Sequence, residues 1–192
     1  MAGPLEGIKI IDVSAVISGP MACQVLADLG ADVIKIEPLE IGDITRIGGY
    51  RVGDISAIFA SANRGKRSVA LDLSQEEGVS VFKEIAATAD VLVQNFRPGA
   101  VDRMGIGPDE MLKLNPELIY VSISGFGPDG PYRDWRVYDP IIQSISGVVS
   151  IQQSQDVPIP DLVRTIVCDK TTALTAANAI SAALFARETG KA

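Results

Sequence analysis

The sequence predicts an α/β fold in which helices flank a Rossmann-like parallel sheet. Residues 7–37 read as one strand, a loop, a helix and a second strand, and further short apolar runs alternate with helical patterns along the chain. A strand, a crossover helix and another strand within so few residues require a parallel, right-handed unit. The sheet is therefore expected to be parallel and buried on both faces.

The first unit begins with the apolar run 8–11 and ends with the run 33–36, both rich in β-branched residues. The helix between them is expected to open at Pro20, whose missing N–H costs nothing in a first turn, and to end at Gly30. Ligands of such units bind beyond the carboxyl ends of the strands, which here means the loop 14–20. That loop lacks the G-x-G-x-x-G spacing, so NAD and FAD are disfavoured, while an ordinary turn without a ligand is an equal alternative.

The next segment, 38–57, is rich in glycine and is expected to form a long surface excursion. Arg64, Lys66 and Arg67 follow it closely, either as a solvated charged turn or as an anion clamp. Later strands are expected at 68–73, 90–93 and 118–122.

Helices are expected at 75–87, 108–114, 139–149 and 170–187. Ser74 is expected to open the first of them through a capping box, and Asp169 stands where the N-cap of the last would lie. The apolar face of the last helix is expected to include Leu174, Ala177 and Leu184 and to pack against a sheet. From its position before the helix alone, Asp169 is favoured for a capping role over a catalytic one.

Two loops carry candidate ligand groups. Asn95, Phe96 and Arg97 follow the strand 90–93, although Asn95 could form only an Asx turn and Phe96 could belong to the core. The segment 124–140 combines glycines and prolines with aromatic residues and arginine, which could bind a phosphorylated adenine ligand or pin the loop to the core.

Composition restricts the function classes. The 192 residues, 47% hydrophobic and 21% charged, suit one globular domain, and a net charge of −7 without a basic stretch argues against nucleic acid. No apolar run suits a membrane span and no signal peptide is recognised, so a cytoplasmic protein is expected. Cys23 and Cys168 are expected to be buried free thiols. The absence of histidine removes Ser-His and Cys-His pairs and most zinc sites, and no metal site is predicted.

Several motifs occur together in a specific order from Leu5 to Lys191. They are PLEGIKIIDVS with SGP, LADLGADVIKIE, GDITR, NRGKRSVALDL, ADVLVQNFRPGAVDRMG, NPELIYVSISGFGPDGP and ALFARETGK. In order and spacing they resemble the family III CoA-transferases, which include formyl-CoA transferase, carnitine CoA-transferase and, more distantly, the 2-methylacyl-CoA racemases.

The resemblance implies coenzyme A as a co-substrate, with no permanently bound cofactor, and an acyl-CoA and a carboxylic acid as reaction partners. Asp169 matches the nucleophile, which would form a mixed anhydride and then an aspartyl-CoA thioester. A helix N-terminus would keep this carboxylate ionised, and backbone donors would stabilise the oxyanion. The positions matching the CoA crevice and substrate pocket are Val16, Ile17, Ser18, Leu71, Asp72, Leu73, Ser74, Asn95, Phe96, Arg97, Arg103, Arg136 and Tyr138.

Three positions depart from the family pattern. Pro38 stands where formyl-CoA transferase has an arginine on the adenosine, Ala173 replaces a common glycine, and Ile17 replaces a glutamine near the reacting acyl group. The change at Ile17 argues against a formyl/oxalate exchange. The racemase alternative is disfavoured because its histidine base corresponds to Tyr138 and the chain has no histidine.

Chains of this family are about twice as long and are interlinked in pairs. The 192 residues are therefore expected to be one incomplete CoA-binding α/β domain, the N-terminal part of the large domain, with a small domain and a C-terminal return beyond residue 192. An interlinked homodimer is expected for the longer protein, and self-association or poor solubility for this part alone. The alternatives are a CoA-binding or assembly module without turnover and a plain structural domain without CoA affinity.

Overall fold

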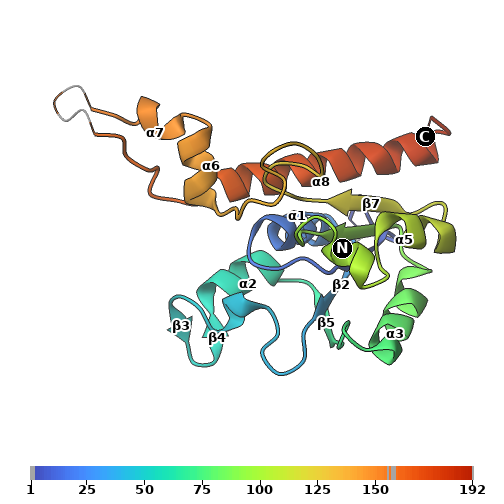
Figure 1. The fold of residues 1–192 in the computed structure, drawn as a ribbon. Helices are drawn as coiled ribbons and strands as arrows, with labels where there is room; N and C mark the ends of the chain where they lie inside the picture. Colours follow the sequence, from blue (N-terminus) through green and yellow to red (C-terminus); the bar gives the residue numbers. More distant parts are fainter. Residues whose placement is uncertain (1–2, 155, 157–158, 192) are drawn as a thin grey trace.

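A computed structural model describes residues 3–154, 156 and 159–191, and a five-stranded parallel sheet lies at its centre (Figure 1). The strand order across the sheet is β5-β2-β1-β6-β7, and every neighbouring pair is parallel. Counted along the chain, these five strands have the 3-2-1-4-5 order of a doubly wound fold, which confirms the predicted Rossmann-like class. Their bounds are β1 (Lys9–Asp12), β2 (Asp32–Glu37), β5 (Arg67–Ala70), β6 (Val91–Gln94) and β7 (Ile119–Ser122).

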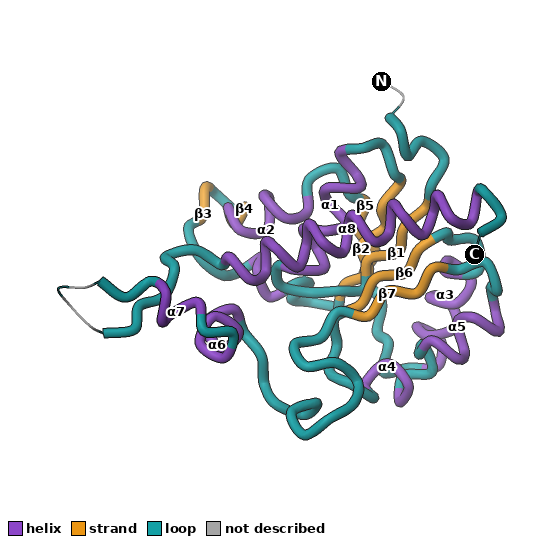
Figure 2. Tube along the Cα trace, turned by 90° about the horizontal axis from the view of Figure 1, so that it is seen from above, coloured by secondary structure: helices purple, strands orange, loops and turns teal. Residues whose placement is uncertain are grey.

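Helices cover both faces of this sheet, as Figure 2 shows from above. Successive strand residues point to opposite faces, so Ile10 packs in one core cluster and Ile11 in the other, and both are fully buried. The Ile10 face is covered by α1 (Ser18–Asp28) and α8 (Val167–Glu188). The Ile11 face is covered by α3 (Glu76–Ala86), α4 (Ala100–Arg103) and α5 (Pro108–Leu114).

The remaining elements lie around one end of the sheet. A 3-10 turn η1 (Ile44–Arg46) precedes an antiparallel hairpin of β3 (Arg51–Val52) and β4 (Ile55–Ser56), and α2 (Ala57–Asn63) then packs on α1. Beyond the N-terminal end of α8, α6 (Asp139–Ile145) and α7 (Val148–Ile151) project from the body of the molecule (Figure 1).

Several predicted elements differ from the structure. Residues 57–63 form a helix because Ser56 caps it, its hydroxyl accepting from the Phe59 N–H at 3.4 Å. Ser74 caps nothing, because its hydroxyl donates to Asp72 instead, and Gln75 is the N-cap of α3. The helix expected at 139–149 breaks at Gly147, whose φ of 81° lies in the left-handed region. Three residues of the loop expected after that helix, 155, 157 and 158, lie outside the described residues.

The apolar face of α8 also differs from the prediction. Leu174 is 60% exposed, whereas Ala173, Ala177 and Ile180 are buried together with Leu184. This face packs chiefly on α1 and also touches β7. Small alanine side chains allow α1 and α8 to approach closely. The buried face begins at Ala173, one residue before the predicted Leu174.

The segment that contains η1 and the hairpin exposes many large apolar side chains. They are Leu39, Ile41, Ile44, Ile47, Tyr50, Val52, Ile55 and Ile58. A cluster of this kind is typical of an interaction surface. In the described part of the chain, no helix has the length and hydropathy needed to cross a membrane.

Candidate active site

The candidate site lies where the connections of the sheet change direction. From β1 the chain crosses to β2 through α1 on one face, and from β6 it reaches β7 through α4 and α5 on the other. The loops that leave these adjacent strands therefore diverge and open a crevice at the carboxyl ends. A cavity of about 450 Å³ lies there, lined by residues 15–18, 95–98, 123–126, 133, 135–139 and 142 and by the first turns of α8.

The loop after β1 holds an unusual backbone conformation. Val16 has a φ of 70°, which a β-branched residue rarely adopts. Its N–H donates to Asp43 Oδ2 at 3.2 Å, and on its other side Asn95 brackets Ala15, accepting from the Ala15 N–H at 2.9 Å and donating to the Ala15 carbonyl at 2.7 Å. Strain of this kind persists only where surrounding contacts enforce it, so the loop is a preformed wall of the cavity.

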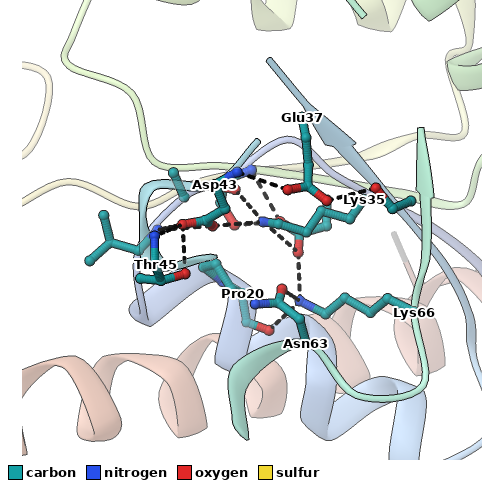
Figure 3. Close-up of polar contacts among 12 residues, drawn as sticks. Pro20, Lys35, Glu37, Asp43, Thr45, Asn63 and Lys66 are labelled. Atoms are coloured by element: carbon teal, nitrogen blue, oxygen red, sulfur yellow. Dashed lines mark hydrogen bonds and ion pairs between the residues drawn. The ribbon is translucent and has the colours of Figure 1, made fainter. Parts of the chain in front are cut away.

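A network of buried charged side chains contacts this loop (Figure 3). Lys35 Nζ donates to the Ser14 carbonyl at 2.8 Å and lies 3.1 Å from Asp43 and 3.8 Å from Asp12. Lys66 Nζ donates to Asp12 at 2.7 Å, to the Pro20 carbonyl at 2.7 Å and to Asn63 at 2.8 Å. All four charged side chains are at most 2% exposed, and the two lysines balance the two aspartates. Buried charges paired in this way fix their neighbours firmly.

A second ion pair extends the network toward the surface. Glu37 accepts from Arg46 Nε at 2.7 Å, from the Ser68 hydroxyl at 2.6 Å and from the Asp43 N–H at 2.8 Å. These hydrogen bonds outweigh the effect of burial and lower the pKa of Glu37 to about 2. The Arg46 guanidinium lies 3.8 Å above the centre of the Phe59 ring, which ties the excursion 38–57 to α2.

The start of α1 packs directly against the same loop. Gly19 lies in its first turn, and the Ser14 side chain occupies the place where a Cβ at Gly19 would be. Only glycine permits this approach, which explains one residue of the SGP motif physically. Ile17, the N-cap of α1, makes no capping hydrogen bond, so the first N–H groups of this helix have no acceptor from an N-cap side chain.

Asp169 also lines the cavity, in the first turn of α8. The helix begins at Val167 with Ile166 as N-cap, so the expectation that Asp169 is the N-cap is wrong. Its N–H is instead bound by Asp139 Oδ2 at 2.9 Å. Burial and then the charge of Asp139 raise the pKa of Asp169 above its ordinary value, while the Ser18 hydroxyl lowers it, so the expected net lowering by the helix dipole is not found.

The structure distributes the predicted site residues over one cavity and its two neighbours. Asp169 shares the cavity described above with eight of the predicted binding residues: Val16, Ile17, Ser18, Asn95, Phe96, Arg97, Arg136 and Tyr138. Leu71, Asp72, Leu73 and Ser74 line a second cavity of about 670 Å³, which shares Ala15 and Phe96 with the first. Arg103 lines a third cavity beside Leu73 and Ser74. The predicted residues therefore line three neighbouring cavities that share residues at their borders.

Some of these side chains already have partners within the chain. Asn95 forms no Asx turn, because its amide is used to bracket Ala15. Phe96 packs partly against the core and also lines two cavities. Asp72 accepts from the Ser74 hydroxyl at 2.6 Å and from the Ser74 N–H at 2.9 Å, which lowers the pKa of Asp72. The exposed Arg97 and Arg136 make no ion pair in the described chain and present free guanidinium groups.

The basic residues at 64–67 do not form an anion clamp. Arg64 pairs with Asp28 and Arg67 pairs with Asp32, while Lys66 turns inward to Asp12. Each cation already has its own carboxylate, so no common anion site exists among them. The alternative of a solvated turn holds for Arg64 and Arg67 but fails for the buried Lys66.

The aromatic residues of the segment 124–140 gather at the mouth of the cavity. Tyr132 and Trp135 have ring centres 4.4 Å apart, and both contact Phe126 edge to face. Tyr132 is 46% exposed and Trp135 is 55% exposed, so they do not pin the loop to the core. Cys168 also lines the cavity and is only half-buried, whereas Cys23 is buried as predicted.

Sequence reasoning missed the residues that hold the site in place. They are Lys35, Asp43, Lys66, Asp139 and Gln143. One signal was available, because Lys35 interrupts an apolar strand that is buried on both faces and a charge there requires a buried partner. Among the described residues, no group of three or more His, Cys, Asp or Glu side chains could hold a metal ion.

The fold and crevice define an α/β protein with a ligand site at the switch point of a doubly wound sheet. The chain belongs to CoA-transferase family III, whose sequence model matches residues 5–192. It is 44% identical over 190 residues to an acetyl-CoA:oxalate CoA-transferase from Acetobacter aceti, covering 98% of this chain and 49% of the relative. It is 40% identical over 192 residues to a human succinyl-CoA:glutarate CoA-transferase, covering 98% of this chain and 43% of the relative.

Solved structures agree with this assignment. A CAIB/BAIF family protein from Brucella suis superposes with a TM-score of 0.93 at 38% identity, covering all of this chain and 52% of the other. A protein from Mycobacterium tuberculosis superposes with a TM-score of 0.90 at 34% identity. The chain thus spans about half the length of the relatives it matches.

Proposed function

We propose that the protein transfers coenzyme A from an acyl-CoA thioester to a carboxylic acid, with Asp169 as the nucleophile. The carrying observation is the cavity that joins Asp169 to the loops after β1 and β6 at the switch point of the sheet. Membership of CoA-transferase family III and the names of the relatives support this reaction.

The proposed reaction is balanced without any further reactant. The Asp169 carboxylate attacks the thioester carbonyl, the C–S bond breaks, and CoA departs as the thiolate. Asp169 and the acyl group are then joined in a mixed anhydride. The thiolate then attacks the Asp169 carbonyl and releases the donor acid, which leaves an aspartyl-CoA thioester. The acceptor carboxylate then attacks the aspartyl-CoA carbonyl and displaces CoA thiolate, which forms a second mixed anhydride. The thiolate attacks the acceptor carbonyl of this anhydride, and the products are the new acyl-CoA and the free Asp169 carboxylate. No proton is gained or lost overall, so the chemistry needs no histidine.

The walls of the crevice suit a long, anionic ligand. Arg97, Arg136 and Arg103 are exposed along it and are proposed to bind CoA phosphates or to flank the pantetheine arm. The predominantly apolar second cavity, with residues 71–74 at its edge, is proposed to take the adenosine end. The loop 16–18 and Tyr138 then lie nearest the reacting acyl group, together with Asp169.

The names of the relatives suggest which substrates to test. They pair acetyl-CoA, formyl-CoA or succinyl-CoA with oxalate or glutarate. Ile17 offers an apolar wall beside the acyl group, which favours the methyl group of acetyl-CoA over formyl-CoA as donor.

The experiment is an intact-mass measurement after brief exposure to each acyl-CoA, followed by peptide mapping. An acyl or CoA adduct on Asp169 is expected, and it should be lost in Asp169→Asn and kept in Asp161→Asn, which changes an exposed carboxylate nearby. The same measurement on a chain extended to the full length of the relatives completes the test. Absence of an adduct from both chains would refute the transferase proposal.

A second candidate function is a CoA-binding or assembly module without turnover, which the exposed guanidinium groups of Arg97 and Arg136 at the cavity would serve equally well. It predicts CoA binding to these 192 residues with no adduct until the remainder is present. A homodimer and a cytoplasmic location also belong to the proposal. The exposed apolar surface between Leu39 and Ile58 supports the former, and the free thiols of Cys23 and Cys168 are compatible with the latter.

A further inference from the structure

A buried carboxylate on a neighbouring helix holds the backbone of Asp169. The N-cap of α8, Ile166, has no capping side chain, and the N–H of Asp169 is among the first donors of that helix. Asp139 Oδ2 accepts from this N–H at 2.9 Å. Asp139 lies in the first turn of α6. It accepts a hydrogen bond from a first-turn N–H of α8, as an N-cap side chain does within its own helix.

Gln143 makes this arrangement rigid. Its amide nitrogen donates to the other carboxylate oxygen of Asp139 and to the Thr165 carbonyl at 3.2 Å, and its amide oxygen accepts from the Val163 N–H at 2.8 Å. Asp139 is 5% exposed and Gln143 is 1% exposed. One buried pair therefore links α6, the irregular segment 163–165 before α8 and the first turn of α8.

We propose that Asp139 is a positioning residue that fixes Asp169 in the cavity and favours its conversion to an uncharged acyl adduct. This inference rests on the proposed function of Asp169. Acylation, like protonation, removes the negative charge of the Asp169 carboxylate, so repulsion from Asp139 favours both changes. Asp139 lines the same cavity as Asp169, and it contacts Asp169 through the backbone N–H of that residue.

Other charged and titratable groups lie around Asp139 and Asp169. Lys170, next in the chain, donates to Thr165 Oγ1 at 2.7 Å, and the Ser18 hydroxyl of α1 lowers the pKa of Asp169. Burial and the charges of Asp139 and Asp169 raise the pKa of the Cys168 thiol, so Cys168 adds no charge near neutral pH. The remaining titratable or charged groups on the cavity walls are Arg97, Arg133, Arg136 and Tyr138.

The test is a carboxyl-carbon NMR titration of Asp169 in the wild type, in Asp139→Asn and in the control Asp161→Asn. The Asp169 pKa is expected to fall in Asp139→Asn and to stay unchanged in Asp161→Asn. Each unit of that fall predicts about a tenfold shift from adduct toward free carboxylate in the intact-mass assay. An unchanged Asp169 pKa in folded Asp139→Asn would overturn the inference.

The wild type provides a measurement that needs no substitution. Burial and the charge of Asp139 raise the pKa of Asp169, so the wild-type Asp169 signal is expected to titrate above the ordinary pKa of an aspartate. An Asp169 pKa at or below that ordinary value would overturn the inference even if Asp139→Asn did not fold. Failure of the proposed function would appear differently, as a raised Asp169 pKa in the wild type without any adduct from any acyl-CoA.

Discussion

Lys66 offers the sharpest test of the buried network, because Lys66→Met removes its ammonium group while keeping a side chain of similar length. The substitution leaves Asp12 Oδ2 without its partner at 2.7 Å and removes the donor from the Pro20 carbonyl and from Asn63. Removing one partner of a buried ion pair costs about 3–5 kcal/mol. Asp12 keeps Ser14 and the more distant Lys35, so we expect a loss near the lower limit, about 3 kcal/mol.

Urea unfolding followed by circular dichroism measures this loss. With a slope of about 2 kcal/mol per molar urea, the midpoint should fall by about 1.5 M. The matched control is Lys113→Met, whose ammonium makes an exposed pair with Glu110 and should leave the midpoint unchanged. A fall below about 0.5 M in Lys66→Met would refute the reasoning, because the network would then contribute no more than a surface pair.

A double-mutant cycle identifies the cause. If the loss comes from the unpaired charge of Asp12, then adding Asp12→Asn to Lys66→Met should cost less than the sum of the two single changes. For residues in direct contact the difference is typically about 0.5–3 kcal/mol. Additive losses would place the cost in the Pro20 and Asn63 contacts instead.

Three further predictions follow from single positions. Glu37 has a folded pKa of about 2 against an unfolded value of about 4.3, so its contribution, up to about 3 kcal/mol, is complete above about pH 5 and disappears as the pH falls toward 2. Urea midpoints of the wild type and Glu37→Gln should therefore converge as the pH is lowered, and a constant difference would contradict this. Gly19→Ala places a methyl group where the Ser14 side chain lies and should lower stability by about 1–3 kcal/mol, measured by the same unfolding assay; an unchanged midpoint would contradict the close packing. Val16→Gly relieves a positive φ, so it should raise the melting temperature while weakening CoA binding in calorimetry. Glu40 is the other described non-glycine residue with a positive φ, and Glu40→Gly should raise the melting temperature without affecting CoA binding.

The sheet could be predicted because its signals are local. The apolar runs around Ile10, Val33 and Val91 each lie within one strand, and such runs suit strands buried on two faces. The helix α2 could not be predicted in the same way. Its sequence AIFASAN has little amphipathic pattern, and it forms through the Ser56 cap and its packing against α1. The role of Asp169 as a nucleophile was predicted from the family resemblance and not from any pattern in the residues.

The contacts that hold the site were less accessible to sequence reasoning, because they join residues far apart in the chain. Asp139 binds the Asp169 N–H across thirty positions, and Lys66 reaches Asp12 across fifty-four. A capping pattern searches only the neighbouring residues, so it assigned the cap of α8 to Asp169 itself. Only the folded chain shows that the acceptor lies on α6.

The buried charges have a geometric reason to be where they are. Apolar residues of similar volume often stabilise a core as well as a buried ion pair does, so stability alone does not explain two lysines and two aspartates beneath one loop. An apolar core, however, has no acceptor for the Val16 N–H and no donor for the Ser14 carbonyl, and both groups need partners once the loop turns through a positive φ. Asp43 and Lys35 provide them, and Lys66 neutralises Asp12 below. The network thus stabilises a backbone conformation that hydrophobic packing could not enforce, at the loop that lines the same cavity as Asp169.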